Sequence, residues 1–350
     1  VFIPICAKHM KTAFAFYFEC NVVNLNAFQE ELWQHLDTNI KRGIQSVLLL
    51  IQYVDGLLTS TPQTSPFSRY DNIPMPYDPS ILVYAVGKPV QLSSASKPYI
   101  VPMDTNDGRK LILVKTEDVR KDRFAIMIAD MISRLTELNC VTYPIFVTET
   151  GGWIETIQNA KTLFQLKKER QTIQNYILSM SPYSVVNHLR NDFAVSCAGA
   201  CMLSYILGVG DRHLENILVT SDGRVLHIDF SYVLGADPKF SKAEMRITPE
   251  MLDMLGGKSS LHYQYFKHCI SMSYQKIRRY THFFYTSMRY LATLPGIELS
   301  DVECHIKNRL LPGELDEEAE LNISQIMERS SGSWRDKFSD ISHMVFQMEL

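Results

Sequence analysis

The sequence lacks any apolar run long enough to cross a membrane. Its longest such stretch, SVLLLIQYV at 46–54, is far shorter than the roughly 20 residues that a membrane-spanning helix needs. An excess of charge of one sign is also missing, because 35 Lys and Arg residues stand against 38 Asp and Glu residues, for a net charge of −3. A broad basic surface for binding nucleic acid is therefore not expected.

Cysteine is scarce, and its spacing does not suggest a disulfide framework. The seven cysteines include no CxxC pair, which favours a reducing compartment. Cys197 and Cys201 lie one helical turn apart in SCAGAC (196–201). Two thiols without a further set of His or Cys ligands are better explained as packed core residues than as a zinc site. The chain begins with Val rather than Met, so we expect it to be a piece of a longer protein.

The 350 residues, 46% of them hydrophobic, are enough for two or three globular domains. Apolar residues spaced three and four apart, as in FQEELWQHLDTNIKRGIQSVLLLIQYV, predict a helical region at 1–60. The segment that follows, TSTPQTSPFSRYDNIPMPYDP, holds five prolines and has little periodicity. We therefore expect a linker at 61–79.

Strand-like and helical patterns then alternate in a way that predicts an α+β fold of two lobes. Strands are expected at ILVYAV, YIVPM, KLILVK, TYPIFV and GWIETI, and an amphipathic helix at DRFAIMIADMISRLTEL (122–138). From about residue 160 the chain is helical, except for two strands around a Ser-Asp-Gly turn in NILVTSDGRVLHIDF. A β-rich lobe at 80–157 and a mainly helical lobe at 158–350 form the bilobal plan that closes over a nucleotide.

One stretch, GVGDRHLENILVTSDGRVLHIDFSYVLG at 208–235, gathers several polar side chains that suit phosphoryl transfer. That reaction needs a metal ion that bridges phosphates, a group that takes the hydroxyl proton and a cation on the phosphates. Asn216 and Asp229, thirteen residues apart, fall at the outer ends of two hairpin strands, which would bring them side by side. An amide and a carboxylate oxygen suit Mg²⁺ or Mn²⁺. The pair is therefore a candidate metal site.

The order GDRHxxN followed by HIDF is the signature of the phosphatidylinositol 3- and 4-kinase superfamily. The stretch SCAGACMLSYILGVGDRHLENILVTSDGRVLHIDFSYVLGADPKF (196–240) resembles the class III phosphatidylinositol 3-kinases most, and the similarity continues through ITPEMLDMLGG. The resemblance implies a kinase-like bilobal fold and transfer of the γ-phosphate of ATP to the 3-hydroxyl of phosphatidylinositol. It also implies a cytoplasmic enzyme on endosomal or autophagic membranes, with regulatory protein subunits bound through regions outside this chain.

The resemblance assigns roles in the polar stretch. His213 is the candidate general base, and its ordinary pKa near 6.5 suits proton acceptance at neutral pH. Asp211 would orient or assist it, and Arg212 would brace the loop through a carboxylate. Between Asp229 and Glu250 the only cations are Lys239, Lys242 and Arg246. Lys239 is the expected contact of the single lipid phosphate, and all three could instead be solvated loop charges.

The resemblance also assigns the nucleotide site. A strand lysine would contact the α- and β-phosphates, and a helical carboxylate would hold its ammonium group. An aromatic residue would line the adenine pocket, two hinge residues would pair with adenine through their backbones, and a serine in SASK (94–97) would belong to the loop over the phosphates. Lys115 would be the strand lysine and Asp122 the helical carboxylate. Tyr143 would be the aromatic residue, Glu155 and Ile157 the hinge residues, and Ser94 the serine of the loop over the phosphates.

Some features leave alternatives open. Ser231 stands where the family has glycine after Asp-Phe, which suggests a non-catalytic nucleotide-binding regulator as one alternative. A related protein Ser/Thr kinase is another, because it shares GDRH and HIDF. The segment KTEDVRKD (115–122) is one residue shorter than in the family. The C-terminal segment SWRDKFSDISHMVFQMEL has one apolar helical face, which could either pack in the core or insert into a bilayer.

Overall fold

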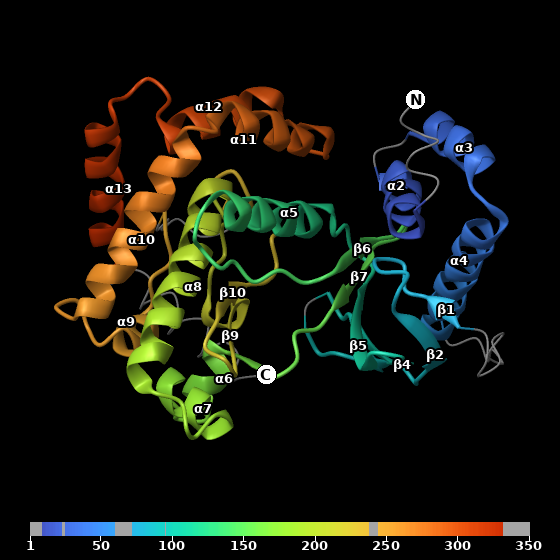
Figure 1. The fold of residues 1–350 in the computed structure, drawn as a ribbon, viewed down its shortest axis with the longest axis horizontal. Helices are drawn as coiled ribbons and strands as arrows, with labels where there is room; N and C mark the ends of the chain where they lie inside the picture. The colour runs from blue at the N-terminus through green and yellow to red at the C-terminus, as the bar shows by residue number, and fades with distance from the viewer. Residues whose placement is uncertain (1–8, 23–24, 60–71, 95, 238–243, 332–350) are drawn as a thin grey trace. The chain divides into compact units, whose positions relative to one another are not determined.

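The computed structural model describes residues 9–22, 25–59, 72–94, 96–237 and 244–331, and the chain divides into two compact units (Figure 1). The first unit comprises residues 1–123 and 143–156, and the second comprises residues 124–142 and 157–350. Strands dominate the central part of the first unit, and helices dominate the second. The predicted α+β fold with a β-rich and a mainly helical lobe is confirmed.

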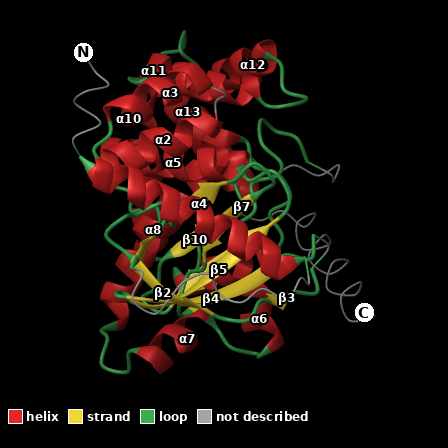
Figure 2. Ribbon diagram, turned by 90° about the vertical axis from the view of Figure 1, so that its right-hand side faces the viewer, coloured by secondary structure: helices red, strands yellow, loops and turns green. Residues whose placement is uncertain are grey.

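In its described part, the first unit contains the helices α2, α3 and α4 and an antiparallel sheet, whose larger strands are the yellow arrows β2, β4, β5 and β7 of Figure 2. The strand order is β1-β2-β4-β5-β7-β6, and β3 pairs with β4. The elements are α2 (Met10–Val22), α3 (Asn26–His35), α4 (Thr38–Leu58), β1 (Ile73–Pro74), β2 (Leu82–Val86), β3 (Val90–Gln91), β4 (Tyr99–Thr105), β5 (Gly108–Lys115), β6 (Ile145–Val147) and β7 (Gly152–Glu155).

One hydrophobic core joins these helices to the sheet. Helix α4 begins where the Asp37 carboxylate accepts a hydrogen bond from the Ile40 amide, an N-cap that satisfies an otherwise unpaired donor. Its buried face, spaced three and four residues apart, shares the core with apolar strand residues. Ile73 and Met75 are buried in the same core. The last part of the segment predicted as a linker therefore contributes a strand to the sheet.

The second unit is built around a helix that is buried along most of its length. This helix, α8, packs against α10, and a small antiparallel sheet of order β10-β9-β8 lies beside it. Cys197 and Cys201 are buried in α8, in agreement with the prediction of packed core thiols. The elements are β8 (Ala160–Thr162), α6 (Leu163–Lys168), α7 (Ile173–Met180), α8 (Val186–Leu207), η1 (Leu214–Asn216), β9 (Ile217–Thr220), β10 (Val225–His227), α9 (Pro249–Met254), α10 (Leu261–Arg278), α11 (Thr281–Met288), η2 (Arg289–Thr293), α12 (Leu299–Leu310) and α13 (Asp316–Ser330).

The longer predicted elements agree with the structure. The strands predicted at 81–86, 99–103 and 110–115 are β2, β4 and β5, and the helix predicted at 122–138 is α5 (Arg120–Leu135). The predicted hairpin is β9 and β10, in which Ile217 pairs with His227. Strands β1, β3 and β8, of two or three residues each, were not predicted.

Two sequence features bear on a possible contact with membranes. Among the described residues, no helix combines the length and the apolar character that crossing a bilayer requires. The amphipathic C-terminal helix predicted within 333–350 lies outside the described residues.

Gly151 lies very close to the backbone at the end of β5, and a substitution there tests this packing in the first unit. A Cβ atom at Gly151 would lie 2.0 Å from the Lys115 carbonyl oxygen and 2.9 Å from the Thr116 Cα, which are backbone atoms that cannot rotate away. We expect Gly151→Ala to lower the free energy of unfolding in urea by about 2–3 kcal/mol, the effect of overpacking a rigid site.

Gly313 provides the matched control for this substitution, because its Cβ would meet no atom within 4 Å. Gly313→Ala is expected to change the free energy of unfolding by less than about 0.5 kcal/mol. Equal effects of the two substitutions would contradict the close approach at Gly151.

Candidate functional site

The candidate site lies at the open end of the β9–β10 hairpin, after the buried helix α8. Gly208 ends this helix in the left-handed conformation, with φ of +60°. A Cβ at Gly208 would lie 2.4 Å from the His305 Cε1 atom and 2.6 Å from the Gly235 amide nitrogen. Only glycine fits at this close approach, so the chain can turn sharply from α8 into the loop at 209–216.

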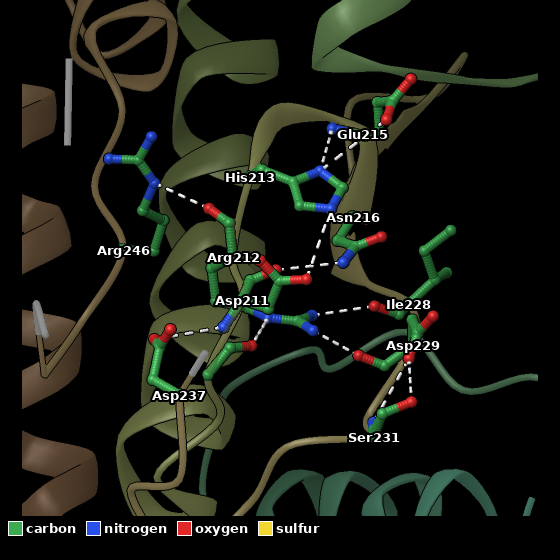
Figure 3. A network of polar contacts seen from close by, with 11 residues as sticks. Asp211, Arg212, His213, Glu215, Asn216, Ile228, Asp229, Ser231, Asp237 and Arg246 are labelled. Carbon is green, nitrogen blue, oxygen red and sulfur yellow. Dashed lines mark hydrogen bonds and ion pairs between the residues drawn. The ribbon is translucent and has the colours of Figure 1, made fainter. Parts of the chain in front are cut away.

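Arg212 fixes the loop to the end of the hairpin. Its Nε atom donates to the Gly210 carbonyl oxygen at 2.8 Å, and its terminal nitrogens donate to the carbonyl oxygens of Ile228, at 2.8 Å, and Asp229 (Figure 3). The guanidinium group also lies 5.6 Å from the centre of the Phe230 ring. The sequence predicted that Arg212 braces the loop through a carboxylate, whereas these bonds run to main-chain carbonyl oxygens. One rigid fork thus holds the loop at 209–216 and the Asp-Phe segment in a fixed relative position.

Asn216 and Asp229 come together because β9 and β10 pair. The Ile228 amide donates to the Asn216 carbonyl oxygen at 3.1 Å, so the residue before β9 is tied to the segment after β10. The Asn216 side-chain nitrogen donates to the Asp211 carbonyl oxygen at 3.0 Å. This bond fixes the orientation of the amide and leaves Oδ1 as its ligand atom. An amide oxygen and a carboxylate therefore fit a hard divalent cation that also binds phosphate oxygens.

His213 and Asp211 form a pair beside this candidate metal site. The His213 Nε2 atom lies 3.7 Å from the Asp211 carboxylate, and Nδ1 accepts a hydrogen bond from the Glu215 amide at 3.3 Å. The Asp211 amide donates to the Asp237 carboxylate at 3.2 Å. The ring is thus oriented by the loop itself, and its Nε2 edge faces a carboxylate (Figure 3). Such a pair can accept and stabilise a proton.

Ser231 accommodates the absence of the family glycine. Asp229 has the positive φ, of +62°, whereas Ser231 is not among the described non-glycine residues with positive φ. The Ser231 hydroxyl donates to the Asp229 Oδ1 atom at 2.6 Å, and its amide donates to the same atom at 3.3 Å. A side chain at position 231 therefore causes no backbone strain, and it orients the carboxylate of the candidate ligand.

Residues 152–299 match the sequence profile of the family described as phosphatidylinositol 3- and 4-kinase. This range begins at β7 and includes the loop, the hairpin and the Asp-Phe segment. This part of the chain is similar to a phosphatidylinositol 3- and 4-kinase domain. The resemblance found in the sequence is thereby confirmed.

Individual relatives of this phosphatidylinositol 3- and 4-kinase domain include proteins named phosphatidylinositol 3-kinase VPS34. The one from Arabidopsis thaliana is 32% identical over 241 residues, which are 63% of this chain and 29% of the relative. The one from Saccharomyces cerevisiae is 32% identical over 61% of this chain and 26% of the relative. Phosphatidylinositol 3-kinase pik3 of Schizosaccharomyces pombe is 29% identical over 59% of this chain and 28% of the relative. The chain spans less than a third of the length of these relatives.

Two residues predicted to bind nucleotide phosphates carry buried charges in the first unit. Lys115 ends β5 and is 8% exposed, and Asp122, in the first turn of α5, is 3% exposed. The Lys115 ammonium lies 3.0 Å from the Glu117 carboxylate, a partner that the sequence did not single out. Lysine and aspartate are rarely buried unless they are paired, and Glu117 supplies a partner for Lys115. The orienting role of Asp122 stays a prediction.

The other predicted nucleotide contacts have different surroundings. Tyr143 is buried just before β6, and Ser94 is exposed in the turn after β3. Glu155 ends β7 in the first unit, and Ile157 begins the second unit. Lys239, the predicted lipid contact, lies outside the described residues. The roles of these residues stay predictions.

Arg246 corrects one alternative from the sequence, in which it was a solvated loop charge. It is 5% exposed, and its Nε atom donates to the Arg212 carbonyl oxygen at 2.9 Å. It therefore supports the family domain's loop next to His213, as Figure 3 shows. No local sequence signal distinguishes Arg246 from the other two cations of the segment, because the contact joins residues 34 apart in the chain.

The buried His227, at the end of β10, provides a test by pH. Burial, followed by the positive charge of Arg212, lowers the pKa of His227 to about 3. An unfolded histidine has a pKa near 6.5, so below that pH the unfolded state binds a proton that the folded state excludes. This contribution to stability is complete above pH 6.5 and is lost as the pH falls toward 3.

We expect the free energy of unfolding in urea to fall by about 1.4 kcal/mol per pH unit because of His227 alone, between about pH 6 and pH 4. His227→Gln removes the titrating group, so its unfolding free energy should depend less steeply on pH by that amount. Carboxylates and the buried His305 titrate in both proteins and cancel in the difference. Parallel pH profiles for the two proteins would contradict a neutral buried His227.

Proposed function

We propose that this chain is the catalytic region of a lipid kinase, which transfers the γ-phosphate of ATP to the 3-hydroxyl of phosphatidylinositol and yields phosphatidylinositol 3-phosphate. The observation that carries the proposal is the joint arrangement of Asn216 and Asp229 beside the His213–Asp211 pair, held by Arg212. The similarity to proteins named phosphatidylinositol 3-kinase supports this choice of activity.

In this proposal Asn216 and Asp229 hold Mg²⁺ or Mn²⁺ through two hard oxygens. The metal ion supplies positive charge to the phosphate oxygens when it is bound. Lys115 adds a second positive charge at the α- and β-phosphates, and Asp122 orients it. The further nucleotide contacts are Tyr143, the backbones of Glu155 and Ile157, and Ser94. Catalysis by such a site consists mainly of positioning and of compensating charge on the transferred group.

The proton of the inositol hydroxyl is assigned to the His213–Asp211 pair. The His213 ring accepts the proton, and the Asp211 carboxylate, 3.7 Å from Nε2, stabilises the resulting imidazolium by its negative charge. Arg212 does not contact the substrate in this assignment. Its bonds to carbonyl oxygens keep the base and the metal ligands at a constant separation while the charge moves.

The lipid and its membrane complete the proposal. A single diester phosphate needs few cations, and Lys239 is assigned to it. The burial of Arg246 leaves fewer cations in the segment 229–250 for additional headgroup phosphates. We infer a cytoplasmic protein that works at the surface of endosomal or autophagic membranes, with regulatory subunits attached through parts of the protein beyond this chain.

The lipid substrate is tested with radiolabelled ATP and vesicles of phosphatidylinositol, its 4-phosphate or its 4,5-bisphosphate, beside a peptide panel. We expect the highest initial rate on phosphatidylinositol, with phosphatidylinositol 3-phosphate as product, because extra phosphates beside Asp237 and Glu244 would be repelled. As a control, Asp229→Ala should lower the rate at least about a hundredfold, since a ligand of the metal is lost. Faster turnover of the bisphosphate or of peptides would contradict the assignment, and so would near-normal activity of the Asp229→Ala variant.

The base is tested by His213→Ala. We expect kcat to fall roughly 10²- to 10⁴-fold, the usual contribution of a positioned general base, while ATP affinity measured by calorimetry stays nearly unchanged. Asp211→Asn, which keeps the shape but removes the charge, should cause a smaller loss. If His213→Ala instead weakens ATP binding in step with activity, His213 has a structural role and Asp211 becomes the better base.

A further inference from the structure

Glu155 lies at the point where the chain leaves the sheet of the first unit. It is the last residue of β7, and the first unit ends one residue later, before Ile157 begins the second. Its amide donates to the Pro144 carbonyl oxygen at 3.0 Å, and the Thr156 amide donates to the Leu111 carbonyl oxygen at 2.9 Å. The main chain is thus hydrogen-bonded to two neighbouring segments up to the last residue of the first unit.

The Glu155 side chain is bonded at both carboxylate oxygens. The Tyr77 hydroxyl donates to Oε2 at 2.6 Å, and the Lys110 ammonium lies 3.1 Å from Oε1. Lys110 also pairs with Asp107 at 2.8 Å. We call Tyr77, Lys110 and Glu155 the carboxylate clamp. Its ionic side chains are 13% and 18% exposed, which places their contacts in a medium of lower dielectric than water.

The ionisation states of the clamp favour these bonds. Burial, reinforced by the Glu155 contact, raises the pKa of the Tyr77 phenol, so the hydroxyl keeps its proton and remains a donor. The hydrogen bond to Asp107 raises the pKa of the Lys110 ammonium, which therefore stays positive. Hydrogen bonds in which one partner is charged are shorter and stronger than bonds between neutral groups.

The clamp connects three parts of the first unit that are distant in sequence. Tyr77 belongs to the segment between β1 and β2, and Lys110 belongs to β5. The Tyr77–Glu155 bond spans 78 residues. A carboxylate used only for solubility would not need two donors from separate segments. The arrangement instead restricts one backbone position, at the end of β7.

We propose that Tyr77 and Lys110 are positioning residues, which act through the Glu155 carboxylate to fix the backbone of residues 155–157 for adenine recognition. This inference rests on the proposed function, in which Glu155 and Ile157 contact adenine through their backbones. Fixing these groups before binding reduces the entropy that binding loses. Adenine is remote from the transferred phosphate, so the clamp should affect nucleotide affinity and leave the phosphoryl-transfer step largely unchanged.

The experiment measures binding of a non-hydrolysable ATP analogue with Mg²⁺ by calorimetry, together with kcat and the KM for ATP. Tyr77→Phe removes one donor and keeps the ring. We expect it to raise the Kd and the KM roughly three- to tenfold, with kcat within about twofold, because a hydrogen bond to a charged group is lost. Lys110→Met should have a similar or larger effect.

Tyr285→Phe is the matched control in the second unit. The Tyr285 hydroxyl donates to a Glu303 carboxylate oxygen at 2.7 Å, a bond of the same kind and nearly the same length as that in the clamp. We expect nucleotide affinity to be unchanged in this variant. Melting temperatures of all the variants show whether any loss of affinity follows from a loss of folding.

A double-mutant cycle shows whether Tyr77 acts through Glu155. In a Glu155→Ala background, which keeps the backbone, Tyr77→Phe should cause almost no further change in Kd. Additive effects, an unchanged Kd for both Tyr77→Phe and Lys110→Met, or an equal loss in Tyr285→Phe would overturn the inference and leave the proposed function intact. If the unsubstituted protein binds no ATP analogue, both the proposed function and the inference fail.

Discussion

The bonds from one guanidinium group, that of Arg212, organise the candidate site. The group donates hydrogen bonds to three carbonyl oxygens, one in its own loop and two in the segment after β10. Because the guanidinium is planar and permanently charged, its donors have a fixed geometry that the two segments must match. The relative position of the His213–Asp211 pair and the candidate metal ligands therefore depends on main-chain bonds. Arg246 extends the arrangement by donating to the Arg212 carbonyl oxygen.

In the first unit, too, close contacts of the main chain fix the position of predicted site residues. Gly151 and Gly152 leave no room for a Cβ atom against Lys115, Thr116 and the Val119 side chain. This close approach fixes the end of β5, where Lys115 lies, against the start of β7, whose last residue is held by the carboxylate clamp. Lys115 ends β5, Asn216 directly precedes β9 and Asp229 follows β10, so each of these residues lies at or next to the end of a strand.

The difference from the family pattern at Ser231 has a simple conformational reading. Glycine is favoured where φ is positive, and in this chain the positive φ belongs to Asp229, two residues earlier, and not to Ser231. Ser231 supplies a hydroxyl that a glycine would lack, and the hydroxyl bonds to the candidate metal ligand. The sequence departure that suggested a non-catalytic regulator is therefore compatible with an intact arrangement of Asp211, His213, Asn216 and Asp229.

The sequence by itself determined the longer strands and helices and the β9–β10 hairpin, which ties the segment of Asn216 to that of Asp229. These features depend on periodicity and on residues close in the chain, and the hairpin turn converts their spacing into proximity. Only the tertiary structure decided that Arg246 is buried under the loop, that Glu117 pairs with Lys115, and that Tyr77 and Lys110 hold Glu155. Most of these contacts join residues from 34 to 78 positions apart. Local sequence patterns carry no information about such partners, because the packing of the helices and strands decides which distant residues meet.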